Sequence, residues 1–233
     1  MKKKIFIFFL ELLTNFHLKR VFKFFKKKKL KIIFDVGSYK GEFVDIFANE
    51  YKNAKFYLFE PMQESFFYLK KKFKKKKNIC IINKGICDKN MVLPLNVNVT
   101  SNASTFSEMN NNAFFYKLRK FLLGEKKLVI KKEICKLTSL DEFTKKNNVN
   151  NIDLLKIDVE GFEFKALKGA KDILKKTKYI LIEITFSNIF KNYDNKKIDY
   201  FLKQIGFKKE RRYLFPILNF EDRIYKNLNI NLL

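Results

Sequence analysis

Three charged residues stand at alternate positions at the end of an apolar run, in the stretch DLLKIDVEG over residues 153–161. Side chains of a strand alternate between its two faces, so Lys156, Asp158 and Glu160 share one face if the strand continues that far. Burial of charges costs several kcal/mol per ion unless they are paired or serve a site. We therefore expect an acid–base group in a ligand crevice, and a paired triplet on the surface is the alternative.

A glycine loop is the second candidate site, in the stretch FDVGSYKG over residues 34–41. Glycines between a strand and a helix permit a tight turn and a close approach to a ligand, and the helix start offers unpaired N–H groups. The dinucleotide pattern GxGxxG is absent, because Asp35 and Lys40 stand where two of its glycines belong. Glu60 ends the next predicted strand, where an acid accepts hydrogen bonds from ribose hydroxyls. This combination predicts a nucleoside-type cofactor.

Alternating strands and helices must position these residues. The apolar runs predict strands over residues 31–36, 55–60, 79–83, 152–157, 179–184, 207–213 and 223–225. The helical patterns lie over residues 41–50, 62–73, 140–146, 162–174 and 198–205. Such alternation predicts an α/β fold with a doubly wound, mostly parallel seven-stranded sheet, and its ligand crevice lies at the carboxyl ends of the strands.

Residues 91–133 interrupt this alternation with the polar loop SNASTFSEMNNN and a predicted helix over residues 114–123. A long insertion after the third strand is typical of a lid or a substrate-selecting segment. A surface elaboration without a role in the site is the alternative, and the sequence does not separate the two.

Four motifs together resemble the FkbM family of O-methyltransferases, from about residue 31 to near the C-terminus. They are FDVGSYKG at 34–41, FEP at 59–61, SLDEF at 139–143 and LLKIDVEGFEFKALKGA at 154–170. Their order and spacing agree with the family pattern. The chain departs from that pattern at Ser38, where the family usually has Ala, and at Tyr39, where it usually has Asn.

The resemblance implies the class I methyltransferase fold, which is Rossmann-like, and S-adenosyl-L-methionine as cofactor. It implies methylation of a hydroxyl on a sugar, a glycan or a secondary metabolite. The implied cofactor-binding residues are Asp35, Gly37, Ser38 and Gly41 at the methionine end, Glu60 at the ribose, and Gly85 and Ile86 beside the adenine. The implied base is Asp158 or Glu160, with Lys156 orienting the carboxylates or acting only as their partner.

Metal sites and disulfides have little support in the composition. The chain has three Cys, without a CxxC pair, and one His, so a zinc site is excluded and no metal is predicted. We considered a divalent metal between Asp158 and Glu183, but no ligand cluster supports it. Scattered Cys predict reduced core thiols and a cytoplasmic location. His17 is a poor candidate base, because we expect its segment to lie outside the crevice.

The N-terminal segment, residues 1–29, is predicted to be a basic amphipathic helical extension of a methyltransferase domain at 30–233. Glu11 interrupts its apolar run, which is too short to span a bilayer. The extension either packs on the domain as a cap, which we slightly prefer, or lies on an anionic membrane surface, peripheral to the inner face of the membrane.

The net charge of +26 permits rival functions. A basic chain attracts nucleic acid, so an RNA-directed methyltransferase is one alternative. We disfavour nucleic acid, because Lys, Asn, Ile and Phe are over-used everywhere and the Asn/Asp-Pro-Pro-aromatic motif of base methylation is replaced by Asp158-Val159-Glu160-Gly161. A membrane-surface binding module with a degenerate methyltransferase fold is the non-enzymatic alternative.

Overall fold

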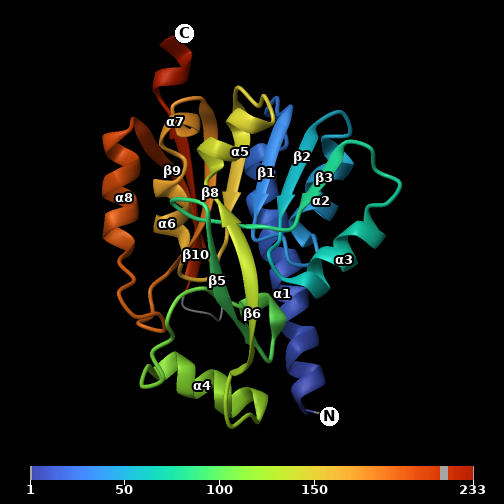
Figure 1. Cartoon of the computed structure of the whole chain (residues 1–233), viewed down its shortest axis with the longest axis vertical. Helices are drawn as coiled ribbons and strands as arrows, with labels where there is room; N and C mark the ends of the chain where they lie inside the picture. Colours follow the sequence, from blue (N-terminus) through green and yellow to red (C-terminus); the bar gives the residue numbers. More distant parts are fainter. Residues whose placement is uncertain (1, 216–219, 233) are drawn as a thin grey trace.

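The computed structural model describes residues 2–215 and 220–232 (Figure 1). Its strands are β1 (Ile32–Val36), β2 (Lys55–Phe59), β3 (Ile79–Ile82), β4 (Gly85–Ile86), β5 (Met91–Asn98), β6 (Val129–Thr138), β7 (Ile152–Ile157), β8 (Thr177–Thr185), β9 (Phe207–Leu214) and β10 (Phe220–Asn227). Its α-helices are α1 (Lys2–Phe25), α2 (Glu42–Glu50), α3 (Gln63–Lys72), α4 (Phe114–Leu123), α5 (Leu140–Lys146), α6 (Glu163–Lys168), α7 (Lys171–Leu174) and α8 (Asn195–Gln204). Short 3-10 helices lie at Ser101–Ala103 and Asn229–Leu232.

The main sheet has seven strands in the order β3-β2-β1-β7-β8-β10-β9. Strands β3, β2, β1, β7 and β8 are parallel, and β10 runs antiparallel to both of its neighbours. The predicted doubly wound, mostly parallel seven-stranded sheet is therefore confirmed. Because β1 and β7 are adjacent, the glycine loop and the charged stretch after β7 emerge side by side.

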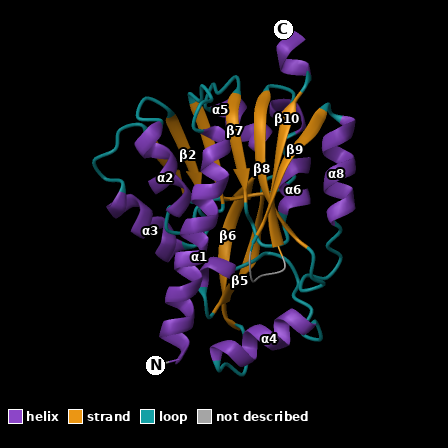
Figure 2. Cartoon of the chain, turned by 180° about the vertical axis from the view of Figure 1, so that it is seen from behind, coloured by secondary structure: helices purple, strands orange, loops and turns teal. Residues whose placement is uncertain are grey.

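Both faces of the sheet are covered, as the near-continuous apolar strands require. Ile33 of β1 packs in one core cluster with α1, α2 and α3, whereas its neighbour Phe34 packs in the other with α5, α6, α7 and α8. Both side chains are fully buried. Figure 1 and Figure 2 show these two helical layers from opposite sides.

Helix α1 packs on the sheet with its C-terminal half. Leu18, Val21 and Phe25 are buried, and Phe25 contacts the ring of Phe47 on α2. The hydroxyl of Tyr51 donates a hydrogen bond to the carbonyl of Phe25. The predicted cap is therefore present in this half of the helix. No helix within the described ranges has the length and apolarity that a membrane span requires.

The insertion after β3 contains a second sheet that the sequence pattern did not predict. Strands β5 and β6 form a long antiparallel pair, and the short β4 joins β6 in parallel. Helix α4 between them occupies the predicted residues, so that part of the prediction is confirmed. The sequence pattern did not indicate β6, because its stretch VIKKEICKLT is rich in Lys and its partner strand lies about thirty residues earlier in the chain.

The helix predicted over residues 162–174 is two shorter helices, α6 and α7. The chain bends at Gly169, where a Cβ atom would lie 1.9 Å from the carbonyl oxygen of Cys87. Only glycine permits this close approach of two backbone segments. The bend thus comes from a long-range contact that helical periodicity does not report.

Candidate functional site

Strand β7 ends at Ile157, before two of the three predicted charged residues. Glu160 and Gly161 have φ angles of 51° and 90°, so the chain turns sharply here. The strand therefore does not continue far enough for alternation to place Lys156, Asp158 and Glu160 on one face, and the turn positions Asp158 and Glu160 instead. A carboxylate that sequence reasoning missed holds the turn: Glu163 Oε1 accepts hydrogen bonds from the amides of Val159 at 3.2 Å and Gly161 at 3.0 Å.

An ion-pair group still brings the two candidate sites together. The ammonium of Lys156 lies 3.1 Å from Asp35 Oδ1 and 3.2 Å from Asp158 Oδ2. It also donates to the carbonyl of Gly37 at 3.3 Å. Burial lowers the pKa of Lys156, but the charges of Asp158 and Asp35 outweigh this effect and raise it. Lys156 therefore stays protonated and neutralises the carboxylates beside it. This arrangement favours the predicted crevice over a surface triplet, because the side chain of Asp35 is fully buried.

At two positions of the glycine loop, the backbone conformation and the close neighbours require glycine. Gly37 has φ 83°, and a Cβ atom there would lie 1.8 Å from the carbonyl oxygen of Asp158. Gly41 has φ 80°, and its Cβ atom would lie 2.8 Å from the ring of Phe73. The hydroxyl of Ser38 donates to the carbonyl of Asp35 at 2.8 Å, which closes the turn before α2 begins. The loop and the turn after β7 are thus packed against each other.

Glu60 connects the loops that follow β1 and β2. Its Oε2 accepts the amide of Tyr39 at 2.7 Å, and its Oε1 accepts the amide of Met62 at 2.9 Å. Burial raises the pKa of Glu60 to about 8, against the opposing effect of these two hydrogen bonds. Each carboxylate oxygen has a second lone pair. Glu60 can therefore hold the loops and still accept hydrogen bonds from a ligand.

Gly85 and Ile86, the predicted neighbours of the adenine, form β4 and are buried. A Cβ atom on Gly85 would lie 3.0 Å from the ring of Phe106, a residue of the insertion. Ile86 belongs to the main core cluster. In this structure the insertion covers the place where these residues were expected to meet an adenine.

Further acidic side chains surround Glu160. Burial raises the pKa of Glu160 to about 7, an effect that the positive charge of Arg119 on α4 opposes and the charge of Asp158 supports. Glu183, near the end of β8, has a pKa raised well above its usual range by burial and by the charges of Asp158 and Glu160. Sequence reasoning considered Glu183 only as a metal ligand. The signal was available, since it is one acid inside the apolar run YILIEIT.

The insertion reaches the turn after β7. The hydroxyl of Thr105 donates to the carbonyl of Glu160 at 2.5 Å, and Arg119 donates to the hydroxyl of Thr100 at 3.2 Å. An isolated bridge joins Met109 to Phe190, which follows β8. These contacts support the interpretation of the insertion as a segment that borders the site.

Helix α1 also lies close to the strand ends, so the expectation that the segment of His17 is outside the crevice is wrong. His17 Nε2 lies 3.0 Å from Asp222 Oδ2, and both side chains are buried. Asp222 is the cross-strand partner of Glu183. The sequence could not show this, because the pair joins residues 205 positions apart.

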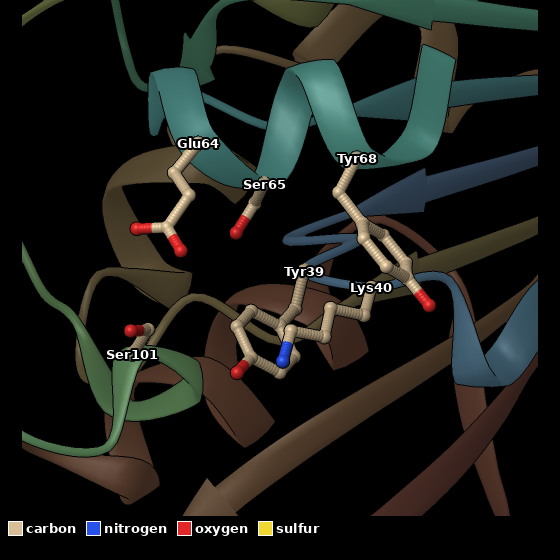
Figure 3. A pocket seen from close by; sticks show the side chains of 6 residues that line it. All are labelled: Tyr39, Lys40, Glu64, Ser65, Tyr68 and Ser101. Carbon is tan, nitrogen blue, oxygen red and sulfur yellow. The ribbon is translucent and has the colours of Figure 1, made fainter. Parts of the chain in front are cut away.

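A cavity of about 180 Å³ opens beside the glycine loop (Figure 3). Its lining residues are Tyr39, Lys40, Glu64, Ser65, Tyr68 and Ser101. Figure 3 shows Tyr39 and Lys40 on one side, with Glu64, Ser65 and Tyr68 projecting from α3 on the other. The cavity adjoins Glu60 through the hydrogen-bonded amide of Tyr39. It is an opening next to the predicted cofactor loop.

This arrangement supports acid–base chemistry. Among the residues that the structure describes, no group of three or more His, Cys, Asp and Glu side chains could hold a metal ion. Partly protonated carboxyls beside an ion-paired Lys can accept a proton near neutral pH. Their negative charge also favours a cationic ligand.

Solved structures of methyltransferases resemble the chain at low sequence identity, and the two with TM-scores of 0.52 and 0.50 share its fold. TrmK of M. capricolum, solved with S-adenosyl-homocysteine, is 14% identical with a TM-score of 0.52, over 92% of this chain and 68% of that one. The METTL16 methyltransferase domain is 10% identical with a TM-score of 0.50, over 87% and 62% of the two chains. An rRNA methylase from Streptococcus thermophilus is 13% identical with a TM-score of 0.48, over 85% and 87%.

A family model decides what the distant structures leave open. No match was found among curated proteins. Residues 35–209 match the model described as the methyltransferase FkbM domain, and this range contains the glycine loop, Glu60 and the charged stretch after β7. The match confirms the predicted class I methyltransferase fold and S-adenosyl-L-methionine as cofactor. The chain belongs to the FkbM methyltransferase family.

Proposed function

We propose that the protein is an O-methyltransferase that transfers the methyl group of S-adenosyl-L-methionine to a hydroxyl of a sugar, a glycan or a secondary metabolite. One observation carries the proposal. The ion-paired group of Lys156, Asp35 and Asp158 joins the glycine loop to a turn that presents Glu160, whose pKa is raised to about 7. A cofactor-binding loop and a carboxyl able to accept a proton are thus adjacent.

The residues present fit the cofactor. The N-terminus of α2 offers backbone amides to its carboxylate, next to Gly37, Ser38 and Gly41. Glu60 has free lone pairs for the ribose hydroxyls, as described above. The acidic surroundings, with Asp35 and Asp158, suit the positive charges of the amine and the sulfonium. Gly85 and Ile86 would flank the adenine after a displacement of Phe106, which now covers Gly85.

The proposed chemistry needs positioning and one proton acceptor. The cofactor supplies an activated methyl group when bound. The protein aligns the acceptor hydroxyl and removes its proton, which positioned carboxylates do well when their pKa lies near the working pH. Glu160 fits this role better than Asp158, because Lys156 neutralises Asp158 directly. Lys156 then acts as the partner that orients Asp158 and ties it to Asp35.

Two measurements test the proposal. Isothermal titration calorimetry with S-adenosyl-homocysteine should show binding, and absence of binding would refute the cofactor assignment. Incubation with S-adenosyl-L-methionine and a panel of acceptors, sugars first, should give a product heavier by one methylene group in mass spectrometry. Methylation of nitrogen acceptors alone would contradict the O-methyl assignment.

An RNA acceptor is the second candidate, and the net charge of +26 is the observation that favours it. Lysines that contact phosphates release counterions, so binding to RNA would weaken steeply as salt rises. A gel shift on labelled RNA at increasing salt measures this. Methyl incorporation into that RNA would replace the small-molecule proposal.

Location is also a proposal. We propose a cytoplasmic protein whose extension, residues 1–29, contacts the anionic inner face of the membrane. Deletion of this extension is a poor test, because Leu18, Val21 and Phe25 are part of the domain core. The division into an extension at 1–29 and a domain at 30–233 therefore describes a difference in amino-acid composition. Point variants are the better probes.

A further inference from the structure

Two helices from distant parts of the sequence expose bulky apolar side chains at the same end of the molecule. Helix α1 and helix α4 both lie at the lower end in Figure 1 and again in Figure 2. The two helices contact each other, since Ile7 packs in the cluster that contains Tyr116 and Leu123 of α4. They therefore form one continuous part of the surface.

The outward side chains of these helices are unusually exposed for their type. We define the α1–α4 face by six residues, which are Phe8, Leu12 and Phe16 of α1 and Phe114, Phe121 and Leu122 of α4. Phe121 is 82% exposed and Phe114 is 68% exposed. Phe8, Leu12 and Phe16 follow one another at intervals of four, so they line one side of α1. Contiguous exposed apolar residues of this kind mark an interaction site.

Positive charge surrounds this apolar face. Residues 113–136 contain eight Lys and Arg against two Asp and Glu. Lys117, Lys126 and Lys127 are exposed, and so is Lys19 on α1. Amphipathic helices with Phe and Leu on one side and Lys around them bind at the boundary between head groups and acyl chains of anionic membranes. Each basic residue near such a surface adds to the electrostatic attraction.

We propose that the α1–α4 face docks on an anionic lipid bilayer. A nucleic acid would satisfy the lysines and could stack unpaired bases on the phenylalanine rings, but it offers no apolar environment for the exposed Leu12 and Leu122. Insertion into the bilayer boundary removes these rings from water while the lysines meet the lipid phosphates. Helix α4 is part of the sequence segment inserted after β3. This segment thus belongs to the docking surface together with the N-terminal helix.

The position of this face has a consequence for the acceptor, and this part rests on the proposed function. The inner sides of the same helices border the predicted crevice, because Arg119 of α4 acts on Glu160 and His17 of α1 pairs with Asp222. Docking would hold the crevice at the bilayer surface. The acceptor class that fits is then a hydroxyl on a lipid head group or on a glycan carried by a lipid.

Co-sedimentation of the full chain with vesicles tests the docking. Phosphatidylcholine vesicles that contain phosphatidylglycerol should bind the protein at least about tenfold more tightly than pure phosphatidylcholine vesicles. The double variant Phe121→Glu/Leu122→Glu should lose about tenfold or more in this affinity. Tyr200→Glu is the matched control, because Tyr200 is 67% exposed and belongs to α8, a helix that lies apart from α1 and α4 in Figure 1.

Equal binding to neutral and anionic vesicles would overturn the proposal, and so would equal losses in the double variant and the control. Phe8→Glu/Phe16→Glu provides an independent second variant, and circular dichroism checks that each protein is folded. A third result would assign the face to RNA or to a second copy of the chain. In that case the parent chain binds no vesicles, and the double variant abolishes a gel shift with RNA or a self-association seen by analytical ultracentrifugation. Calorimetry with S-adenosyl-homocysteine reports separately on the cofactor site, so its failure would remove only the inference about the acceptor.

Discussion

His17 Nε2 of the N-terminal helix lies 3.0 Å from Asp222 Oδ2 in the last strand of the chain, and both side chains are buried. The ring of His17 also packs against Phe215 at a centroid distance of 5.2 Å. This contact ties the first secondary-structure element to the sheet beside Glu183. It makes α1 part of the wall of the site.

Loss of this contact should loosen α1. His17→Ala removes a buried hydrogen bond to a charged group, which costs about 2 kcal/mol of the free energy of unfolding. Urea denaturation measures the loss, and hydrogen exchange should show faster exchange in α1 than in the parent chain. Asn15→Ala, an exposed change two residues away on the same helix, is the control. Identical exchange in both variants would show that the pair does not hold the helix.

Gly37→Ala should be far more damaging than Gly124→Ala, although both glycines have positive φ angles. A Cβ atom at position 37 would lie 1.8 Å from the carbonyl oxygen of Asp158, whereas nothing lies within 4 Å at position 124. We expect a loss of about 3 kcal/mol or more for Gly37→Ala and about 1 kcal/mol for Gly124→Ala. Thermal or urea unfolding of the two variants decides. Similar losses would mean that the loop does not pack against the turn as described.

Glu160→Gln should leave cofactor affinity largely intact and reduce kcat by about 10²- to 10⁴-fold. The base must be deprotonated, so activity of the parent enzyme should rise with pH through about 7, the pKa of Glu160. The residual activity of Glu160→Gln should lack this rise. Asp158→Asn is the companion variant. Full activity of both would end the assignment of the base to this turn.

Glu163 should make the folded state less stable as pH rises. Burial raises its pKa to about 8, so the folded state holds a proton that the unfolded chain, with a pKa near its usual value of 4.5, releases. The group's contribution to stability is complete below about pH 4.5 and is lost as pH rises to about 8. The slope in this window is about 1.4 kcal/mol per pH unit.

Glu163→Gln tests this linkage because it keeps one acceptor oxygen for the amides of Val159 and Gly161. Urea unfolding of the variant gives its free energy of unfolding between pH 5 and pH 8. The slope of this free energy against pH should be smaller than that of the parent chain by the contribution of about one proton. Glu50→Gln, at the exposed end of α2, should leave the slope unchanged. A variant slope equal to that of the parent chain would show that Glu163 is ionised throughout.

Glu60→Gln should weaken binding of S-adenosyl-homocysteine by about tenfold or more, since it replaces one acceptor oxygen by a donor amide. Glu60→Ala should have a larger effect and should also destabilise the loops, because the amides of Tyr39 and Met62 lose their acceptors. Calorimetry gives the affinities and thermal unfolding gives the stability. Unchanged affinity in both variants would refute the ribose role.

Several parts of the fold were determined by short-range features of the sequence. The near-continuous apolar runs at 32–36 and 152–157 require burial on both faces, and this suffices to predict a parallel sheet with two helical layers. The glycines at positions 37 and 41, between a strand and a helix, locate the loop. The charges of Lys156, Asp158 and Glu160 indicated a crevice, because charges inside buried strands need partners or a site, but the pairing of Lys156 with Asp35 appears only in the structure.

The tertiary structure alone decided how the site is completed. The turn at Glu160 depends on the carboxyl of Glu163 and on Thr105 of the insertion, and the position of α1 depends on Asp222. Thr105 and Asp222 are distant in sequence from the residues they contact, so no local periodicity reports them. The raised pKa of Glu160 likewise comes from burial by other segments. A sequence carries the type and spacing of charged groups, but the folded chain determines their distance from water and from one another.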